Sequence, residues 1–347
     1  MSDSIFCVDF GEYYLKVAQV DHKKKILEIK AAAFNEIPFN PYASSAEEVF
    51  KKSEELLVKL IADASIKHQD VNIIIPDSQS YTRIFEMPLL TDKELLSAIK
   101  YQADQFIPIP IDKVSLDVHI LHKDKQNNKV DILLVAAANT VIENIVQIVE
   151  SASLMPVSIE NEASATVRLI TTILKMEKQK NRSTDECEVF INFGNSSTSL
   201  YLFSVTEQRP LQVHNFTLGR SIFYRDILSN YSLNDQQIKD LIENIGFSED
   251  DSTYDLHQLL AAPLNEFVSE VKRFLMSTKE GASGKVRNIY LLGEGSKFAF
   301  LDKKLSSLLG QSITPLNLSE YVSKNSVSDY FKQDWPLLAP VIGGALR

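Results

Sequence analysis

The chain has 347 residues, of which 44% are hydrophobic and 24% are charged, and this composition is typical of a globular protein with two or three domains. Its 36 basic and 46 acidic residues give a net charge of −10, so the sequence offers no overall positive field for nucleic acid or anionic lipid. No apolar run reaches the roughly 18 to 20 residues that span a bilayer, and the first residues lack a signal-peptide pattern. We therefore expect a cytoplasmic protein without direct membrane insertion.

The first part of the chain is predicted to form an α/β lobe. Two strands over residues 5–20 would enclose Gly11 in a hairpin, and a third strand is expected at 26–34. Residues 46–66 carry apolar side chains at helical spacing on one face, and 71–75 is a short apolar run typical of a buried strand.

The character of the sequence changes near Met87. A capping box at residues 91–94 predicts a helix that the run Ile107-Pro108-Ile109-Pro110 ends. Strands are expected at 113–122 and 131–138, followed by a helix that Asn139 caps. These elements predict a small inserted α+β subdomain over residues 87–156.

The second part of the chain is predicted to repeat the plan of the first. A helix from Ile159 and a polar linker at 178–186 would lead into it, and 317–334 shows no clear period and is expected to be a loop. The remaining elements are strands at 188–194, 197–205, 210–217 and 286–292, and helices at 220–229, 234–245, 255–278, 297–309 and 337–347.

One motif occurs in both parts. The run Phe6-Cys7-Val8-Asp9-Phe10-Gly11 and the run Val189-Phe190-Ile191-Asn192-Phe193-Gly194 lie about half the chain length apart. In each, an apolar strand ends in an Asp or Asn that can hold Mg²⁺ or water, and the glycine lets backbone amides approach a phosphate. The pair predicts a nucleotide held between two related lobes.

This order of elements is similar to that of the actin-like ATPase superfamily, which includes actin, the DnaK-type chaperones, sugar kinases and FtsA. The resemblance implies an α/β actin-like ATPase fold of two duplicated lobes with an inserted subdomain. It would divide the chain into subdomain 1A at 1–86, an inserted subdomain 1C at 87–156, the rest of 1A and a linker at 157–186, and a second lobe at 187–347 with a 2B insertion at about 220–285.

The resemblance also implies a site for ATP and Mg²⁺. Asp9 would hold the metal ion, and Glu160 and Glu162 are the candidates for orienting a catalytic water. The implied nucleotide-binding residues come from two phosphate loops and an adenosine turn, and they are Asp9, Gly11, Lys16, Asn192, Gly194, Ser196, Thr198, Gly293 and Gly295.

Within the superfamily, the chain resembles the PilM family of type IV pilus assembly proteins over essentially its whole length. The most specific segment is the helix at 94–106 with the Ile-Pro-Ile-Pro run after it, and the ending Gly343-Gly344 adds to it. The resemblance implies recruitment to the inner membrane by the cytoplasmic tail of a PilN-like protein, and contact with other pilus assembly proteins. The residues expected to line the tail-binding groove are Phe85, Met87, Leu95, Ile99 and Phe106.

The sequence departs from the superfamily at each nucleotide motif. Glu12 follows the first glycine, Asn192 stands where an aspartate is usual, and Glu294 separates the two glycines of the adenosine turn. A carboxylate near phosphate opposes binding, and an amide brings no charge to a metal ion. We therefore expect a scaffold of a type IV pilus or related secretion apparatus, with weak or absent ATP binding and no enzymatic activity. An active ATPase or phosphotransferase and an FtsA-like division protein are the alternatives.

Overall fold

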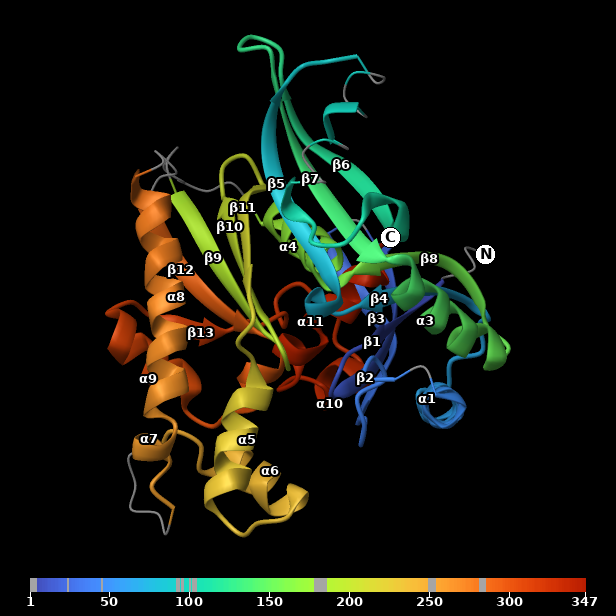
Figure 1. Cartoon of the computed structure of the whole chain (residues 1–347), viewed down its shortest axis with the longest axis vertical. Coiled ribbons are helices and arrows are strands. Elements are labelled where there is room, and N and C mark those ends of the chain that lie inside the picture. The colour runs from blue at the N-terminus through green and yellow to red at the C-terminus, as the bar shows by residue number, and fades with distance from the viewer. Residues whose placement is uncertain are drawn as a thin grey trace.

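The computed structural model describes residues 5–23, 25–44, 46–91, 94, 97–99, 101, 105–177, 186–248, 254–280 and 285–347. Within these ranges the chain forms two five-stranded sheets and one three-stranded sheet, with helices around and between them (Figure 1). No helix in the described ranges is both long enough and apolar enough to cross a membrane.

The first lobe is built on a sheet with the strand order β3-β2-β1-β4-β8. The central strand β1 is buried along its whole length because helices cover both faces of the sheet. Phe6, Val8 and Phe10 pack toward the helices α1 and α3, while Cys7 belongs to the opposite face. The elements are β1 (Phe6–Phe10), β2 (Tyr14–Lys23), β3 (Ile26–Glu36), α1 (Glu47–Asp63), β4 (Asp70–Ile75), α3 (Asn139–Ser151) and β8 (Met155–Asn161).

The second lobe repeats this arrangement in the strand order β11-β10-β9-β12-β13. β9 pairs antiparallel with β10 and parallel with β12, as β1 pairs antiparallel with β2 and parallel with β4. The predicted duplication is therefore confirmed. The elements are β9 (Glu186–Phe193), β10 (Thr198–Ser204), β11 (Arg209–Phe216), α5 (Arg220–Asn230), α6 (Asp235–Asn244), α7 (Leu256–Leu259), α8 (Ala261–Glu280), β12 (Lys285–Leu292), α9 (Leu301–Leu309), β13 (Ile313–Pro315) and α10 (Ser326–Tyr330).

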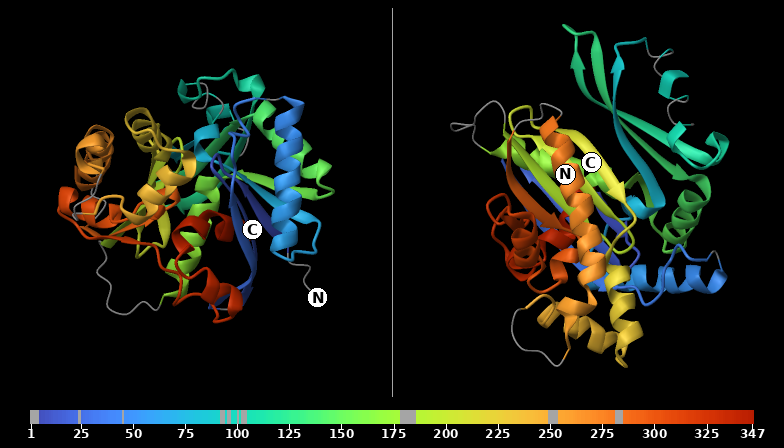
Figure 2. Two further views of the ribbon diagram at one scale, coloured as in Figure 1. Left: turned by 90° about the horizontal axis from the view of Figure 1, so that it is seen from below. Right: turned by 60° about the vertical axis from the view of Figure 1, so that its left-hand side comes forward.

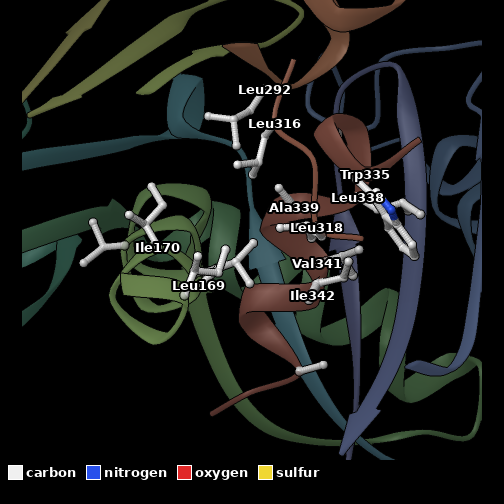
Figure 3. Packing of buried hydrophobic residues seen from close by; sticks show 14 of the residues in the cluster. Leu169, Ile170, Leu292, Leu316, Leu318, Trp335, Leu338, Ala339, Val341 and Ile342 are labelled. Atoms are coloured by element: carbon white, nitrogen blue, oxygen red, sulfur yellow. The ribbon is translucent and has the colours of Figure 1, made fainter. Parts of the chain in front are cut away.

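Two helices, α4 (Glu162–Met176) and α11 (Trp335–Gly344), fill the space between the two large sheets (Figure 1). Their apolar side chains form one buried cluster with Leu292 of the second sheet, as Figure 3 shows. The helices cross closely at Gly343, where a Cβ atom would lie 2.1 Å from the carbonyl oxygen of Ala165. A side chain at Gly343 would therefore push the two helices apart.

The inserted subdomain carries its own sheet in the order β5-β7-β6, which projects from one end of the molecule (Figure 2). Its strands are β5 (Ser80–Pro88), β6 (Val114–Asp124) and β7 (Lys129–Ala138). Alternate residues of β7 face opposite sides of the sheet. Ile132 and Leu134 join the core of the subdomain, whereas Leu133 and Val135 face the lobe beneath.

Several elements differ from the expectation. The segment from Ile159 begins as strand β8, and the helix starts only after Asn161, whose side chain accepts a hydrogen bond from the Ser164 amide. Asn139 is the first residue of α3 and gives it no side-chain cap. Strand β5 was not predicted, the supposed loop at 317–334 contains α10, and most of the predicted linker, 178–185, lies outside the described residues.

Candidate functional site

The first predicted phosphate loop contains a buried ion pair. Asp9, at the end of β1, stands opposite Lys16 of β2, and the Lys16 Nζ atom lies 2.8 Å from Asp9 Oδ2. Both side chains are almost fully buried. Burial raises the pKa of Asp9, and the neighbouring Lys16 only partly offsets this effect. Burial would lower the pKa of Lys16, but the carboxylates of Asp9, Glu162 and Glu294 raise it above its usual value.

Further carboxylates gather around this pair. Glu162 opens helix α4, and burial raises its pKa to about 8 although Lys16 acts in the opposite direction. Glu294 follows Gly293, and burial raises its pKa to about 7. Glu12 is also buried, with its Oε1 atom 3.4 Å from Gln79 Nε2. The site therefore gathers acidic side chains where phosphate groups were predicted, and burial disfavours the charged forms of Asp9, Glu162 and Glu294.

The second predicted phosphate loop uses its polar groups internally. The Gly194 amide donates to the Ser197 carbonyl at 3.0 Å, and the Gly194 carbonyl accepts from the Arg220 amide at 2.9 Å. The Thr198 hydroxyl donates to the Leu218 carbonyl at 2.6 Å, while Ser196 is half-buried in the turn. These bonds tie the hairpin to the start of α5.

The predicted adenosine turn packs directly on the second hairpin. A Cβ atom at Gly293 would lie 2.4 Å from Asn192 Oδ1, and one at Gly295 would lie 2.0 Å from the Phe193 ring. Gly293 also has a positive φ of 74°, which favours glycine. The close approach that these two glycines permit is therefore already taken by Asn192 and Phe193. Asn192 is buried, and its Oδ1 atom has no hydrogen-bond partner among the described residues.

A buried aspartate that the sequence analysis did not single out joins the two lobes. Asp77 follows β4, and its Oδ2 atom accepts hydrogen bonds from Ser199 Oγ at 2.5 Å and Tyr201 Oη at 3.0 Å, both on β10. Its Oδ1 atom accepts from the Ala163 amide at 2.9 Å, at the start of α4. Burial raises the pKa of Asp77. We call this set of contacts the Asp77 clasp.

Two other contacts cross between the lobes. The Arg220 guanidinium lies 3.7 Å from the centre of the Tyr13 ring, next to the first hairpin. Lys239 of α6 forms an ion pair with Glu36 of β3. Together with the Asp77 clasp, these contacts hold the lobes against each other through side chains of the chain itself.

Glu160, the second candidate for orienting water, lies against Arg168 of helix α4 and not in the buried acidic cluster. Its Oε1 atom accepts a hydrogen bond from Arg168 Nη1 at 2.8 Å, and Arg168 also donates to the Gly343 carbonyl at 2.9 Å. The structure therefore brings Glu162 to the buried acidic cluster but leaves Glu160 beside helix α4.

Four of the residues predicted to line the tail-binding groove lie in or against the core of the inserted subdomain. Met87 of β5 and Ile99 are 7% and 3% exposed, and they share one buried cluster with residues of β7. The Phe85 and Phe106 rings meet edge to face, with centres 5.7 Å apart. Leu95 lies outside the described residues. Phe85 and Phe106 are only partly buried, and the assignment of these residues to the tail-binding groove stays a prediction.

A groove with a volume of about 670 Å³ lies on the opposite face of the inserted sheet. One wall is formed by β6 and β7, and helix α4 forms the floor. Residues 207–210 of the second lobe, at the turn from β10 into the first residues of β11, form the other wall. The groove has both charged and apolar lining residues, and the apolar ones include Leu121, Leu133, Val135, Ala137 and Val167.

Two interactions attach the second-lobe turn to the first lobe. Arg209 Nη1 lies 2.7 Å from Asp131 Oδ2 on β7, and Gln208 Nε2 donates to the Leu174 carbonyl of α4 at 2.9 Å. At the other end of the groove, Asn161 lies between the lining and the Asp77 clasp. Its Nδ2 atom is 2.6 Å from Thr82 Oγ1 and 3.2 Å from Asp77 Oδ1.

Comparison with known proteins gives matches over nearly the whole chain. A sequence model described as "Type IV pilus assembly protein PilM" matches residues 7–347. The structure is similar to one titled "PilM-PilN type IV pilus biogenesis complex", with a TM-score of 0.84 and 22% identity over 99% of this chain and 98% of that chain.

Two more distant structures share the fold. The ethanolamine utilization protein EutJ from Carboxydothermus hydrogenoformans has a TM-score of 0.53 and 10% identity over 99% of this chain and 89% of that chain. MreB 5 of Spiroplasma citri, solved bound to AMPPNP, has a TM-score of 0.52 and 11% identity over 100% of this chain and 96% of that chain. These likenesses confirm the predicted actin-like fold.

Proposed function

The chain belongs to the PilM family of type IV pilus assembly proteins, and we propose that it is a scaffold that binds the cytoplasmic tail of a PilN-like inner-membrane protein. The single observation that carries this proposal is the likeness, over 99% of the chain, to the structure titled as a PilM-PilN complex. Through this partner the scaffold would be recruited to the inner membrane, where it would contact other pilus assembly proteins.

The groove between the inserted sheet and α4 is the docking site that we assign to the tail. β6 pairs only with β7 among the described strands, so its other edge can accept an added strand. An extended tail on this edge would form main-chain hydrogen bonds with β6. Its alternate side chains would contact the apolar lining of the groove, which includes Leu121 and Val135.

A matched pair of substitutions on β6 tests this assignment. Leu121 is partly buried and lines the groove, whereas its neighbour Ile120 is 39% exposed and is absent from the lining. We expect Leu121→Asp to weaken binding of a synthetic tail peptide at least about tenfold in calorimetry, because a charge would enter the apolar lining. Ile120→Asp should bind as the unchanged chain does. Equal affinity for both variants would contradict the docking site.

We further propose that ATP binding is weak or lost in this chain. MreB 5 of Spiroplasma citri was solved bound to AMPPNP, so the predicted phosphate loops are the position to examine in this chain. There, Asp9 and Lys16 are paired with each other, and Glu162 and Glu294 are buried beside them. Where one of these carboxyls is ionised, its charge about 5 Å from a phosphate charge costs about 3 kcal/mol at an effective dielectric near 20, or roughly a hundredfold in affinity. The pairing of Asp9 with Lys16 supports weak or lost binding, because the side chain implied to hold the metal ion and the one implied to contact phosphate lie against each other.

Calorimetric titration with ATP and Mg²⁺ tests the second part of the proposal, with Asp9→Ala as the comparison. We expect no binding in the micromolar range for either protein. Micromolar binding that Asp9→Ala removes would contradict it and would favour a nucleotide-regulated protein. Retained tail binding in the absence of nucleotide is the result that a scaffold requires.

A further inference from the structure

The tail-binding groove is built from both lobes. β6, β7 and α4 belong to the first lobe and its insertion, but residues 207–210 belong to the second lobe. Two interactions hold this turn against the first lobe. Arg209 forms an ion pair with Asp131 of β7, and Gln208 donates a hydrogen bond to the Leu174 carbonyl of α4. Movement of the second lobe away from the first would therefore withdraw one wall of the groove.

The groove also shares a residue with the Asp77 clasp. Asn161 caps helix α4, lines the groove and lies 3.2 Å from Asp77 Oδ1. The other oxygen of the same Asp77 carboxylate accepts the hydroxyl hydrogen bonds from Ser199 and Tyr201 of the second lobe. A path of buried side chains thus runs from Asn161 at the groove, through Asp77, to Ser199 and Tyr201 of the second lobe.

We propose that tail binding and closure of the two lobes are coupled through this composite groove, with the Asp77 clasp as the coupling element. The inference rests on the proposed docking of the tail in the groove. In the closed arrangement both walls are in place, so the tail has its highest affinity for this state. By linkage, a bound tail must stabilise lobe closure by the same factor. The clasp carboxylate joins the lobes through hydrogen bonds to side chains of the second lobe.

The clasp can be loosened from the side that does not touch the groove. Ser199 and Tyr201 donate hydrogen bonds to Asp77 from β10, and neither residue lines the groove. The double substitution Ser199→Ala and Tyr201→Phe removes both hydroxyl donors while each residue keeps most of its volume. Asp77 itself is not substituted, because its Oδ1 atom accepts the Ala163 amide and lies near the groove residue Asn161.

Titration of the full chain with the tail peptide tests the coupling. We expect the folded double variant, checked by circular dichroism, to bind about five- to tenfold more weakly than the unchanged chain, within the usual range of coupling between two sites. Affinity within twofold of the unchanged chain, with binding lost in Leu121→Asp, would overturn the coupling and leave the docking site intact. Undiminished binding in Leu121→Asp would overturn the docking site and the coupling with it.

A second measurement leaves the clasp unchanged. Val58 on α1 and Leu228 on α5 are 47% and 46% exposed and lie on different lobes (Figure 1). Spin labels on Val58→Cys and Leu228→Cys would report the distance between lobes, because the native Cys7 and Cys187 are buried. We expect the peptide to narrow the distance distribution. An identical distribution with saturating peptide would overturn the proposal.

Discussion

Removing the ammonium group of Lys16 should be the most costly single change in the buried acidic cluster. The substitution Lys16→Met keeps the length of the side chain and leaves Asp9 buried without its partner at 2.8 Å. Breaking a buried ion pair by removing one member typically costs about 3–5 kcal/mol. Glu162 and Glu294 lose the same neighbouring charge, which places the expected cost at the upper end of this range.

Urea denaturation at pH 7 measures this loss in the free energy of unfolding. The double substitution Asp9→Asn and Lys16→Met should recover at least about 2 kcal/mol of it, because the uncompensated charge is then gone. Lys30→Met is the control. Lys30 also belongs to a strand and pairs with Glu28 at 2.8 Å, but it is solvent-exposed, so we expect little change.

Two results would refute this reasoning. A loss below about 1 kcal/mol for Lys16→Met would mean that the pair is solvated, as surface pairs are. A double variant no more stable than Lys16→Met alone would mean that the loss comes from packing and not from the stranded charge of Asp9.

Two further predictions concern Glu162 and Gly295. The pKa of Glu162 is about 8 in the folded state and 4.5 ordinarily, so between these values the folded state binds more protons than the unfolded state and stability should fall as pH rises. Urea midpoints from pH 5 to pH 8 should show this fall, and Glu162→Gln should reduce its slope. An equal slope in the variant would contradict the assignment. Gly295→Ala should destabilise the chain by about 1–3 kcal/mol in thermal unfolding, because the added Cβ would overlap the Phe193 ring. Gly310→Ala is the control: a Cβ there would meet no neighbouring atom within 4 Å, so only the positive φ opposes alanine and a cost of about 1 kcal/mol is expected. A smaller cost at Gly295 than at Gly310 would contradict the close packing.

The duplicated plan could be predicted from the sequence because each lobe begins with the same local signal. A strand that ends in Asp9 or Asn192, followed by an apolar residue and a glycine, determines a hairpin from neighbouring residues alone. Strand β8 was missed because its seven residues run directly into α4. The signal that could have separated them is Asn161, whose side chain caps the helix at Ser164.

The clasp and the groove could not be predicted in the same way, because they depend on contacts between distant residues. Asp77 and its partner Ser199 are separated by 122 positions in sequence, and a lone aspartate after a buried strand does not identify its partner. Helical spacing placed Ile99 on an apolar face correctly but could not distinguish a groove from a core. Only the folded structure shows that Val135, on the opposite face of the sheet, lines a groove.

Hydrogen–deuterium exchange of the full chain with the tail peptide, without nucleotide, tests the central claim most directly. The account predicts slower exchange along β6, Val114–Asp124, and in the turn at 207–210, because the tail would pair with the strand edge and hold the second-lobe wall. Protection confined to β5 and the segment around Ile99, or protection that appears only with ATP, would contradict it.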